Sequence, residues 1–102
     1  MKYKTSKLAK LERNRKSILT DDLKHCYICK KPATDLHEIY GGANRKASML
    51  NDFCIPMCRS CHQIVTLDYM MSLTLKKVCQ EKFEETHERA EFIRIIGKNF
   101  LE

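Results

Sequence analysis

The sequence predicts a small α+β protein in which a central core of short strands is flanked by helices. The chain has 102 residues, the size of one domain. Both prolines, five of the six cysteines and three of the four histidines fall within residues 25–62. Apolar residues at helical spacing occur on both sides of that segment. We therefore expect a basic arm and helix over residues 1–24, the core over 25–66, and a helical region over 67–102 that packs on the core.

The N-terminal segment concentrates positive charge. Residues 1–25 hold eight basic and three acidic side chains, within a chain whose net charge is +6. Such a basic arm favours a polyanionic partner, of which nucleic acid is the commonest, although a solvated surface helix is the alternative. The side chains of this segment that we expect to contact DNA are Arg13, Arg15 and Lys16.

Two CxxC pairs predict a structural zinc site. They are Cys26-Tyr-Ile-Cys29 and Cys58-Arg-Ser-Cys61. A two-residue spacer lets both thiolates of a pair face one ion, and four sulfurs form the closed tetrahedral set that zinc prefers. A chain this short buries only a modest core, so a metal would supply stability that packing alone does not. The two remaining cysteines are expected to be small buried apolar residues: Cys54 and Cys79.

The segment between the two pairs is long enough to contain a second site. Residues 30–57 number 28, against the roughly 15–20 of a plain four-cysteine module. A short strand carries His37 near its end, a Gly-Gly turn follows, and a second apolar strand returns to the second pair. His62 follows directly, at the start of a helix. A zinc ion that fixes both strand ends would bring the two histidines together, where a carboxylate could help them hold a second, open-sided metal.

The motif HEIYGGANRK, followed by IPMCRSCH, resembles the HNH endonucleases with a ββα-metal core, in particular small HNH proteins encoded by phages and prophages. The resemblance extends from SILTDDLKHCYIC through KFEETHERAEFIRIIGKNFL. It implies a zinc-stapled core that cuts DNA with Mg²⁺ or Mn²⁺. His37 matches the first histidine of the motif and His62 the last. The middle asparagine is either Asn44 or Asn51.

The resemblance leaves the roles of the acidic residues open. Many relatives have His-His or Asp-His where this chain has Leu36 before His37 and Glu38 after it. We expect His37 to activate water, because its ordinary pKa of about 6.5 suits a general base, with His62 on the metal; the alternative is that His37 binds the metal. For the carboxylate, Glu38 has the place in the motif but needs a bulge, whereas Asp35 shares the strand face of His37. Glu38 is the preferred candidate.

Two further basic residues could contact DNA, and two other functional classes fit the same sequence features. Arg45 and Lys46 follow the Gly-Gly turn, where we expect an exposed loop that contacts phosphates. A zinc-ribbon DNA-binding module without catalysis, or a zinc-stapled adaptor that docks proteins through its helical tail, would share most of these features. Cleavage that depends on a divalent metal distinguishes the nuclease from both.

Sequence features also predict where the protein resides and where its last helix ends. No apolar stretch approaches the ~20 residues of a membrane span, and the N-terminus lacks the apolar run of a secretory signal, so we expect a cytoplasmic protein with no membrane partner. Gly97 interrupts the last set of apolar positions and is expected to end a helix there.

Overall fold

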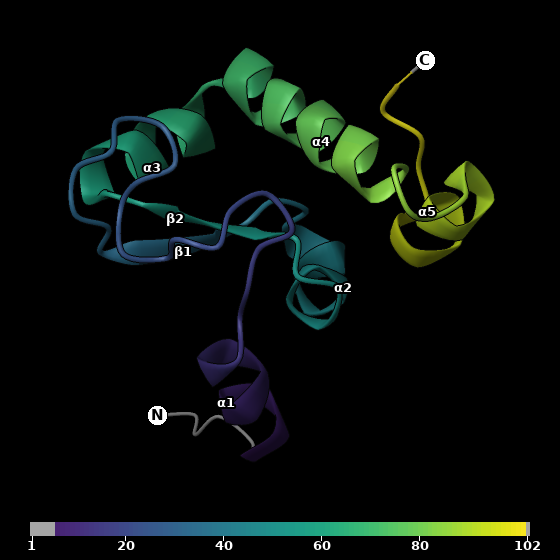
Figure 1. Ribbon diagram of the computed structural model, residues 1–102, viewed down its shortest axis with the longest axis horizontal. Coiled ribbons are helices and arrows are strands. Elements are labelled where there is room, and N and C mark those ends of the chain that lie inside the picture. The colour runs from purple at the N-terminus through teal and green to yellow at the C-terminus, as the bar shows by residue number, and fades with distance from the viewer. Residues whose placement is uncertain (1–5, 102) are drawn as a thin grey trace.

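The computed structural model describes residues 6–101, and the predicted α+β class is confirmed there (Figure 1). Five helices and one two-stranded antiparallel sheet occur in this range. In chain order the elements are α1 (Ser6–Arg13), β1 (Asp35–Glu38), the 3₁₀ turn η1 (Gly42–Asn44), α2 (Arg45–Leu50), β2 (Cys54–Met57), α3 (Arg59–Leu67), α4 (Tyr69–Phe83) and α5 (Arg89–Ile96). Within residues 6–101, no helix has the length and apolar content needed to span a membrane.

The two strands determine which side chains can meet at the site. They pair without a bulge, so that Asp35 lies opposite Met57 and His37 lies opposite Ile55. Because side chains alternate along a strand, Asp35 and His37 share one face of β1 and Glu38 lies on the other. All four residues of β2 are buried, in keeping with its apolar sequence. β2 leads directly into α3, which contacts β1.

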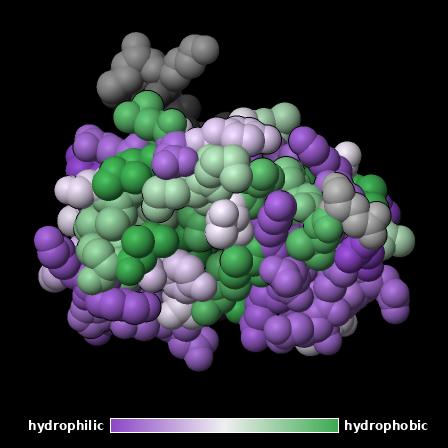
Figure 2. All heavy atoms as spheres, turned by 90° about the horizontal axis from the view of Figure 1, so that it is seen from above, coloured by the Kyte–Doolittle hydropathy of each residue, from purple (hydrophilic) through white to green (hydrophobic). Residues whose placement is uncertain are grey.

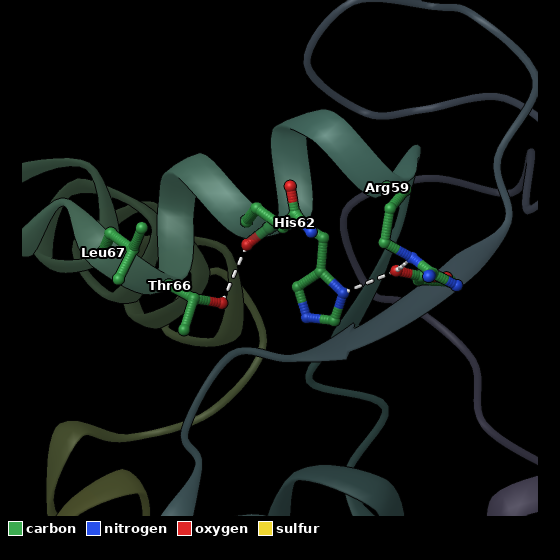
Figure 3. Close-up of a pocket in the computed structure, with 6 residues that line it drawn as sticks. Arg59, His62, Thr66 and Leu67 are labelled. Carbon is green, nitrogen blue, oxygen red and sulfur yellow. Dashed lines mark hydrogen bonds and ion pairs between the residues drawn. The ribbon is translucent and has the colours of Figure 1, made fainter.

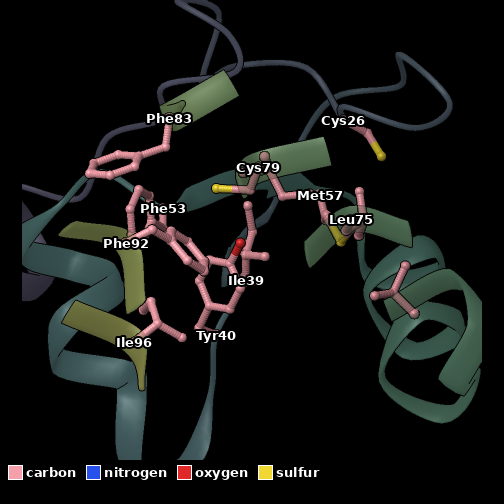
Figure 4. Packing of buried hydrophobic residues seen from close by; sticks show 12 residues of the cluster. Cys26, Ile39, Tyr40, Phe53, Met57, Leu75, Cys79, Phe83, Phe92 and Ile96 are labelled. Atoms are coloured by element: carbon pink, nitrogen blue, oxygen red, sulfur yellow. The ribbon is translucent and has the colours of Figure 1, made fainter. Parts of the chain in front are cut away.

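Aromatic side chains fill the core between the strands, α4 and α5 (Figure 4). Tyr40 makes edge contacts with Phe53 and Phe92, each with ring centroids 5.4 Å apart. Cys54 and Cys79 are fully buried, which confirms their predicted role as small apolar residues. Burial raises the pKa of each of these two thiols to about 12, so both remain protonated and are poor metal ligands.

A buried amide ties the C-terminal segment to α4. Gln80 is fully buried, and its side chain donates to Asn99 Oδ1 at 2.7 Å and accepts from the Phe100 amide at 2.8 Å. Since a buried polar group without partners is costly, this pair of bonds holds residues 99 and 100 in one position beside α4. Phe100 in turn packs against the aromatic core.

The predicted end of the last helix is confirmed. Gly97 adopts the left-handed conformation with φ of 87°, and its amide donates to Ile93 O at 2.7 Å. This is the usual glycine termination of an α-helix, which a residue with a Cβ adopts only at a cost.

We expect Gly97→Ala to lower the free energy of unfolding by about 1–2 kcal/mol, through backbone strain alone. A Cβ at Gly97 meets no atom within 4 Å. Gly41 is a matched control, since a Cβ there also meets nothing within 4 Å but its φ is −84°. Gly41→Ala should leave stability unchanged or raise it by up to ~1 kcal/mol. Equal effects of the two substitutions in urea denaturation would contradict this account.

Candidate functional site

Four cysteine side chains converge on one point. The Sγ atoms of Cys26, Cys29, Cys58 and Cys61 all lie within 4.8 Å of one another, and those of Cys29 and Cys58 are 3.6 Å apart. Tetrahedral zinc with Zn–S bonds of ~2.3 Å requires sulfurs about 3.8 Å apart. The donor set and its spacing therefore fit a metal ion such as zinc.

Local backbone structure forms each half of this cluster. In the first half, the Lys30 amide donates to Cys26 O at 3.0 Å, and Lys30 adopts a left-handed φ of 70° that turns the chain back. In the second half, Cys58 is the N-cap of α3, and its Sγ accepts a hydrogen bond from the Cys61 amide at 3.4 Å. A helix N-terminus favours a thiolate at this position.

The electrostatics of the cluster suit a cation. Burial acts to raise the pKa of Cys26, but hydrogen bonds from backbone amides, of which that of Cys29 contributes most, outweigh it and lower the pKa to about 6. The Cys61 amide lowers the pKa of Cys58. Burial and the three neighbouring sulfurs raise the pKa of Cys61. Thiolates are thus favoured at Cys26 and Cys58. A bound cation would offset the repulsion between four thiolates and so allow the remaining cysteines to ionise as well.

A second cluster lies where β1 faces α3. The rings of His37 and His62 meet edge to face, with centroids 5.1 Å apart. His62 Nδ1 lies 2.8 Å from Asp35 Oδ2, and Arg59 donates to both carboxylate oxygens of Asp35 at 3.1 and 3.2 Å (Figure 3). The structure therefore brings the two motif histidines together and adds Asp35 and Arg59 to them.

The two imidazoles differ in their surroundings. With Nδ1 of His62 directed at Asp35, its Nε2 is the nitrogen left for another ligand, as in carboxylate–histidine–metal arrangements. His37 Nε2 is buried and has no hydrogen-bond partner among the described residues. Burial, followed by the nearby charge of His62, lowers the pKa of His37 to about 4, so this ring is neutral near pH 7. A neutral imidazole nitrogen that has no hydrogen-bond partner could serve as a metal ligand.

The expectation that Glu38 joins the histidines through a bulge is wrong. The β1–β2 register is regular, and Glu38 lies on the opposite face of β1. Its Oε1 pairs with Arg45 Nε at 2.7 Å and with Arg15 Nη1 at 3.4 Å. Asp35, the candidate favoured by strand parity, is the carboxylate that contacts His62. The hydrogen bonds of Arg59 and His62 lower the pKa of Asp35 to about 2, so it is ionised.

Neither candidate asparagine bonds to the histidine cluster. Asn44 Nδ2 donates to Ile96 O at 2.9 Å and so connects η1 to the end of α5. Asn51 Nδ2 donates to Ala47 O at 2.8 Å and closes the end of α2. The geometry thus gives both asparagines bonds to the backbone of helices outside the histidine cluster.

Two of the five predicted DNA contacts have carboxylate partners within the protein. Arg45 pairs with Glu12 and Glu38, and Arg15 pairs with Glu38. Arg45 also begins α2, where an exposed loop was expected. The other three predicted contacts are exposed and remain available to a ligand: Arg13, Lys16 and Lys46. Lys2 and Lys4 of the basic arm lie outside the described residues.

A pocket of about 480 Å³ opens beside the histidine cluster. Its lining comes from β1 and α3 and consists of Asp35, Arg59, His62, Gln63, Thr66 and Leu67. Sequence reasoning missed Arg59, whose side chain is 70% exposed. Its place one turn before His62 on a helix was the available signal, because residues three apart share a helix face.

No protein-family model, curated protein or solved structure matches this chain. We therefore infer function from the chemistry and geometry of the two clusters, together with the motif resemblance.

We expect freshly purified protein to contain one zinc per chain, bound by the four-cysteine cluster. Cys29→Ser should remove most of the zinc and destabilise the fold, because structural zinc contributes apparent binding free energies of ~10–16 kcal/mol. Cys54→Ala is the matched control, since Cys54 is buried outside the cluster. It should keep the zinc and cost about 1 kcal/mol in packing. Elemental analysis that finds no zinc in folded wild-type protein, or full zinc in Cys29→Ser, would refute the assignment.

Proposed function

We propose that this protein is a metal-dependent DNA endonuclease of the HNH type, which hydrolyses phosphodiester bonds. The observation that carries the proposal is the edge contact of His37 and His62 at 5.1 Å, with Asp35 fixing the His62 ring. Two imidazoles and a carboxylate beside an open pocket are the elements of a site that holds a divalent cation with free coordination positions. The motif resemblance supplies the reaction class.

The donor set indicates which ion would suit the site. His37 and His62 would hold it, with Asp35 orienting the His62 ring. Imidazole nitrogens favour Mn²⁺ and later transition ions over Mg²⁺, which prefers oxygen. When bound, such an ion supplies Lewis-acid stabilisation of charge on phosphate and lowers the pKa of bound water. Since His37 Nε2 is buried and His37 does not line the pocket, its position supports the alternative role of metal ligand. A general base must reach the proton that it removes.

Arg59 is the chain's own candidate for binding the phosphate. Its guanidinium stands at the pocket edge, 70% exposed, and is oriented by two hydrogen bonds to Asp35. A guanidinium has five N–H donors, so the N–H groups of Arg59 that do not face Asp35 are left to bind a phosphate oxygen. We propose that Arg59 positions the scissile phosphate next to His62.

A zinc-stapled protein-interaction module is a second candidate, favoured by one observation. Several large apolar side chains are exposed where α3 meets α4: Leu67 is 87% exposed, Tyr69 74% and Met70 64%. Figure 2 shows apolar residues gathered across the middle of the face that contains α3 and α4. Exposed apolar patches of this kind often bind proteins.

We expect the wild-type protein to nick or cut supercoiled plasmid only when Mn²⁺ or Mg²⁺ is added. His62→Ala should lose ~10²-fold or more in rate at low metal concentration, because a ligand is lost, and should recover partly as the concentration rises. His87→Ala is the matched control: His87 is exposed and stacks on Phe83, outside the cluster, so its loss should leave the rate unchanged.

The same assay distinguishes the candidate functions. A wild-type protein that retains its zinc and binds DNA but leaves plasmid intact with every divalent ion would contradict the nuclease and favour a DNA-binding module. The absence of salt-sensitive DNA binding would favour the protein-interaction module. Cleavage by His62→Ala at the wild-type rate at all metal concentrations would refute the site assignment.

A further inference from the structure

Three lysines surround a groove between α4 and the C-terminal segment. Lys76 Nζ lies 5.7 Å and Lys98 Nζ 5.3 Å from the centroid of the Phe100 ring. Lys77 and Lys98 line a groove of about 230 Å³ together with Leu73, Asn99, Phe100 and Leu101. Two ammonium groups are thus attracted to one aromatic ring, and a third lines the same groove.

These lysines differ from many of the other basic residues in lacking an acidic partner. Among residues 6–101, none of Lys76, Lys77 and Lys98 forms an ion pair, whereas the basic groups elsewhere on α4 and α5 do. Those pairs are Lys82–Glu85, Arg89–Glu84 and Arg94–Glu91. Like charges gathered around one groove repel one another, so an anion bound there would be stabilised by all three.

The groove is preformed. Gln80 holds Asn99 and the Phe100 amide, and the Gly97 turn sets the direction in which Lys98 leaves α5. The lysine side chains therefore extend from a backbone that is ordered on both sides of the groove, and less ordering entropy is lost on binding.

A hydrogen bond connects α4 to the segment after β1. Tyr40, two residues beyond the end of β1, donates from its hydroxyl to Lys76 O at 2.6 Å. The helix that carries Lys76 and Lys77 is thereby fixed to the chain three residues beyond His37. Figure 1 shows the C-terminal segment returning beside the α5 end of α4.

We infer that this lysine groove, formed by Lys76, Lys77 and Lys98, binds the phosphodiester backbone of DNA. This inference rests on the proposed function, because it takes the bound polyanion to be the DNA substrate. Ammonium groups act as point charges and suit successive singly charged phosphates, to which they contribute affinity without reading sequence. DNA would therefore be held by α4 and the C-terminal segment, and not by Arg15 and Arg45, whose charges Glu12 and Glu38 together offset.

The test is fluorescence anisotropy with a labelled DNA duplex, without added divalent ions, between 50 and 300 mM NaCl. Lys77→Gln/Lys98→Gln should weaken binding and reduce the slope of log K against log salt by about 1.8, since each lost phosphate contact contributes ~0.9. Lys77→Arg/Lys98→Arg should restore the wild-type slope. The control, Lys30→Gln/Lys31→Gln, removes the same charge from exposed positions just after the first CxxC pair and should leave the slope unchanged.

The outcomes separate this inference from the proposed function. An unchanged slope in Lys77→Gln/Lys98→Gln, an equal reduction in the control, or no DNA binding by the wild type overturns the groove. Zinc content and urea denaturation would show whether each variant is folded. If a double variant does not fold, the single variant Lys77→Gln replaces it, with an expected slope reduction of ~0.9. Binding that follows the expected slopes without plasmid cleavage would support the groove and contradict the nuclease.

Discussion

The four-cysteine cluster is the constraint on which the rest of the structure depends. It joins residues 26–29 to residues 58–61 and so closes a loop that contains both strands. The core of a chain this short gains much of its stability from such a closure. Cys58 also caps α3, and His62 follows Cys61 directly, so the sulfurs that could hold a metal also determine the direction from which His62 approaches β1. Folding and assembly of the histidine site are therefore expected to be coupled.

Strand β1 serves two purposes with its two faces. One face carries Asp35 and His37 toward α3, where they form the candidate metal site. The other carries Glu38, whose side chain is only 14% exposed and is neutralised by arginines from α2 and from the segment after α1. A carboxylate with this little exposure needs such partners, and the pairing attaches the N-terminal helix to the core. The acidic residues on either side of His37 thus have separate roles because strand geometry separates them.

Sequence reasoning succeeded where spacing alone decides geometry. The CxxC spacing predicted the sulfur cluster, and the glycine after an apolar helical pattern predicted the end of α5. The prediction that Glu38 joins the histidines was wrong, because its place in the motif was given more weight than the alternation of side chains along a strand. Sequence reasoning also did not anticipate the ion pairs Arg15–Glu38 and Arg45–Glu12, whose members lie 23 and 33 residues apart in the chain and cannot be seen in a local pattern. The lysine groove was missed for the same reason: α4 and residues 98–101 meet only in the folded chain.

Titration of Mn²⁺ into zinc-loaded, isotope-labelled protein would test whether His37 and His62 bind one divalent ion, as we propose. The ring signals of all four histidines can be followed by NMR, with His25 and His87 as internal controls, since both are exposed. A paramagnetic ion broadens the signals of nearby nuclei. The account predicts that the signals of His37 and His62 broaden together at the lowest Mn²⁺ concentrations, before those of the two controls. Equal broadening of all four, or broadening of His25 or His87 first, would contradict it.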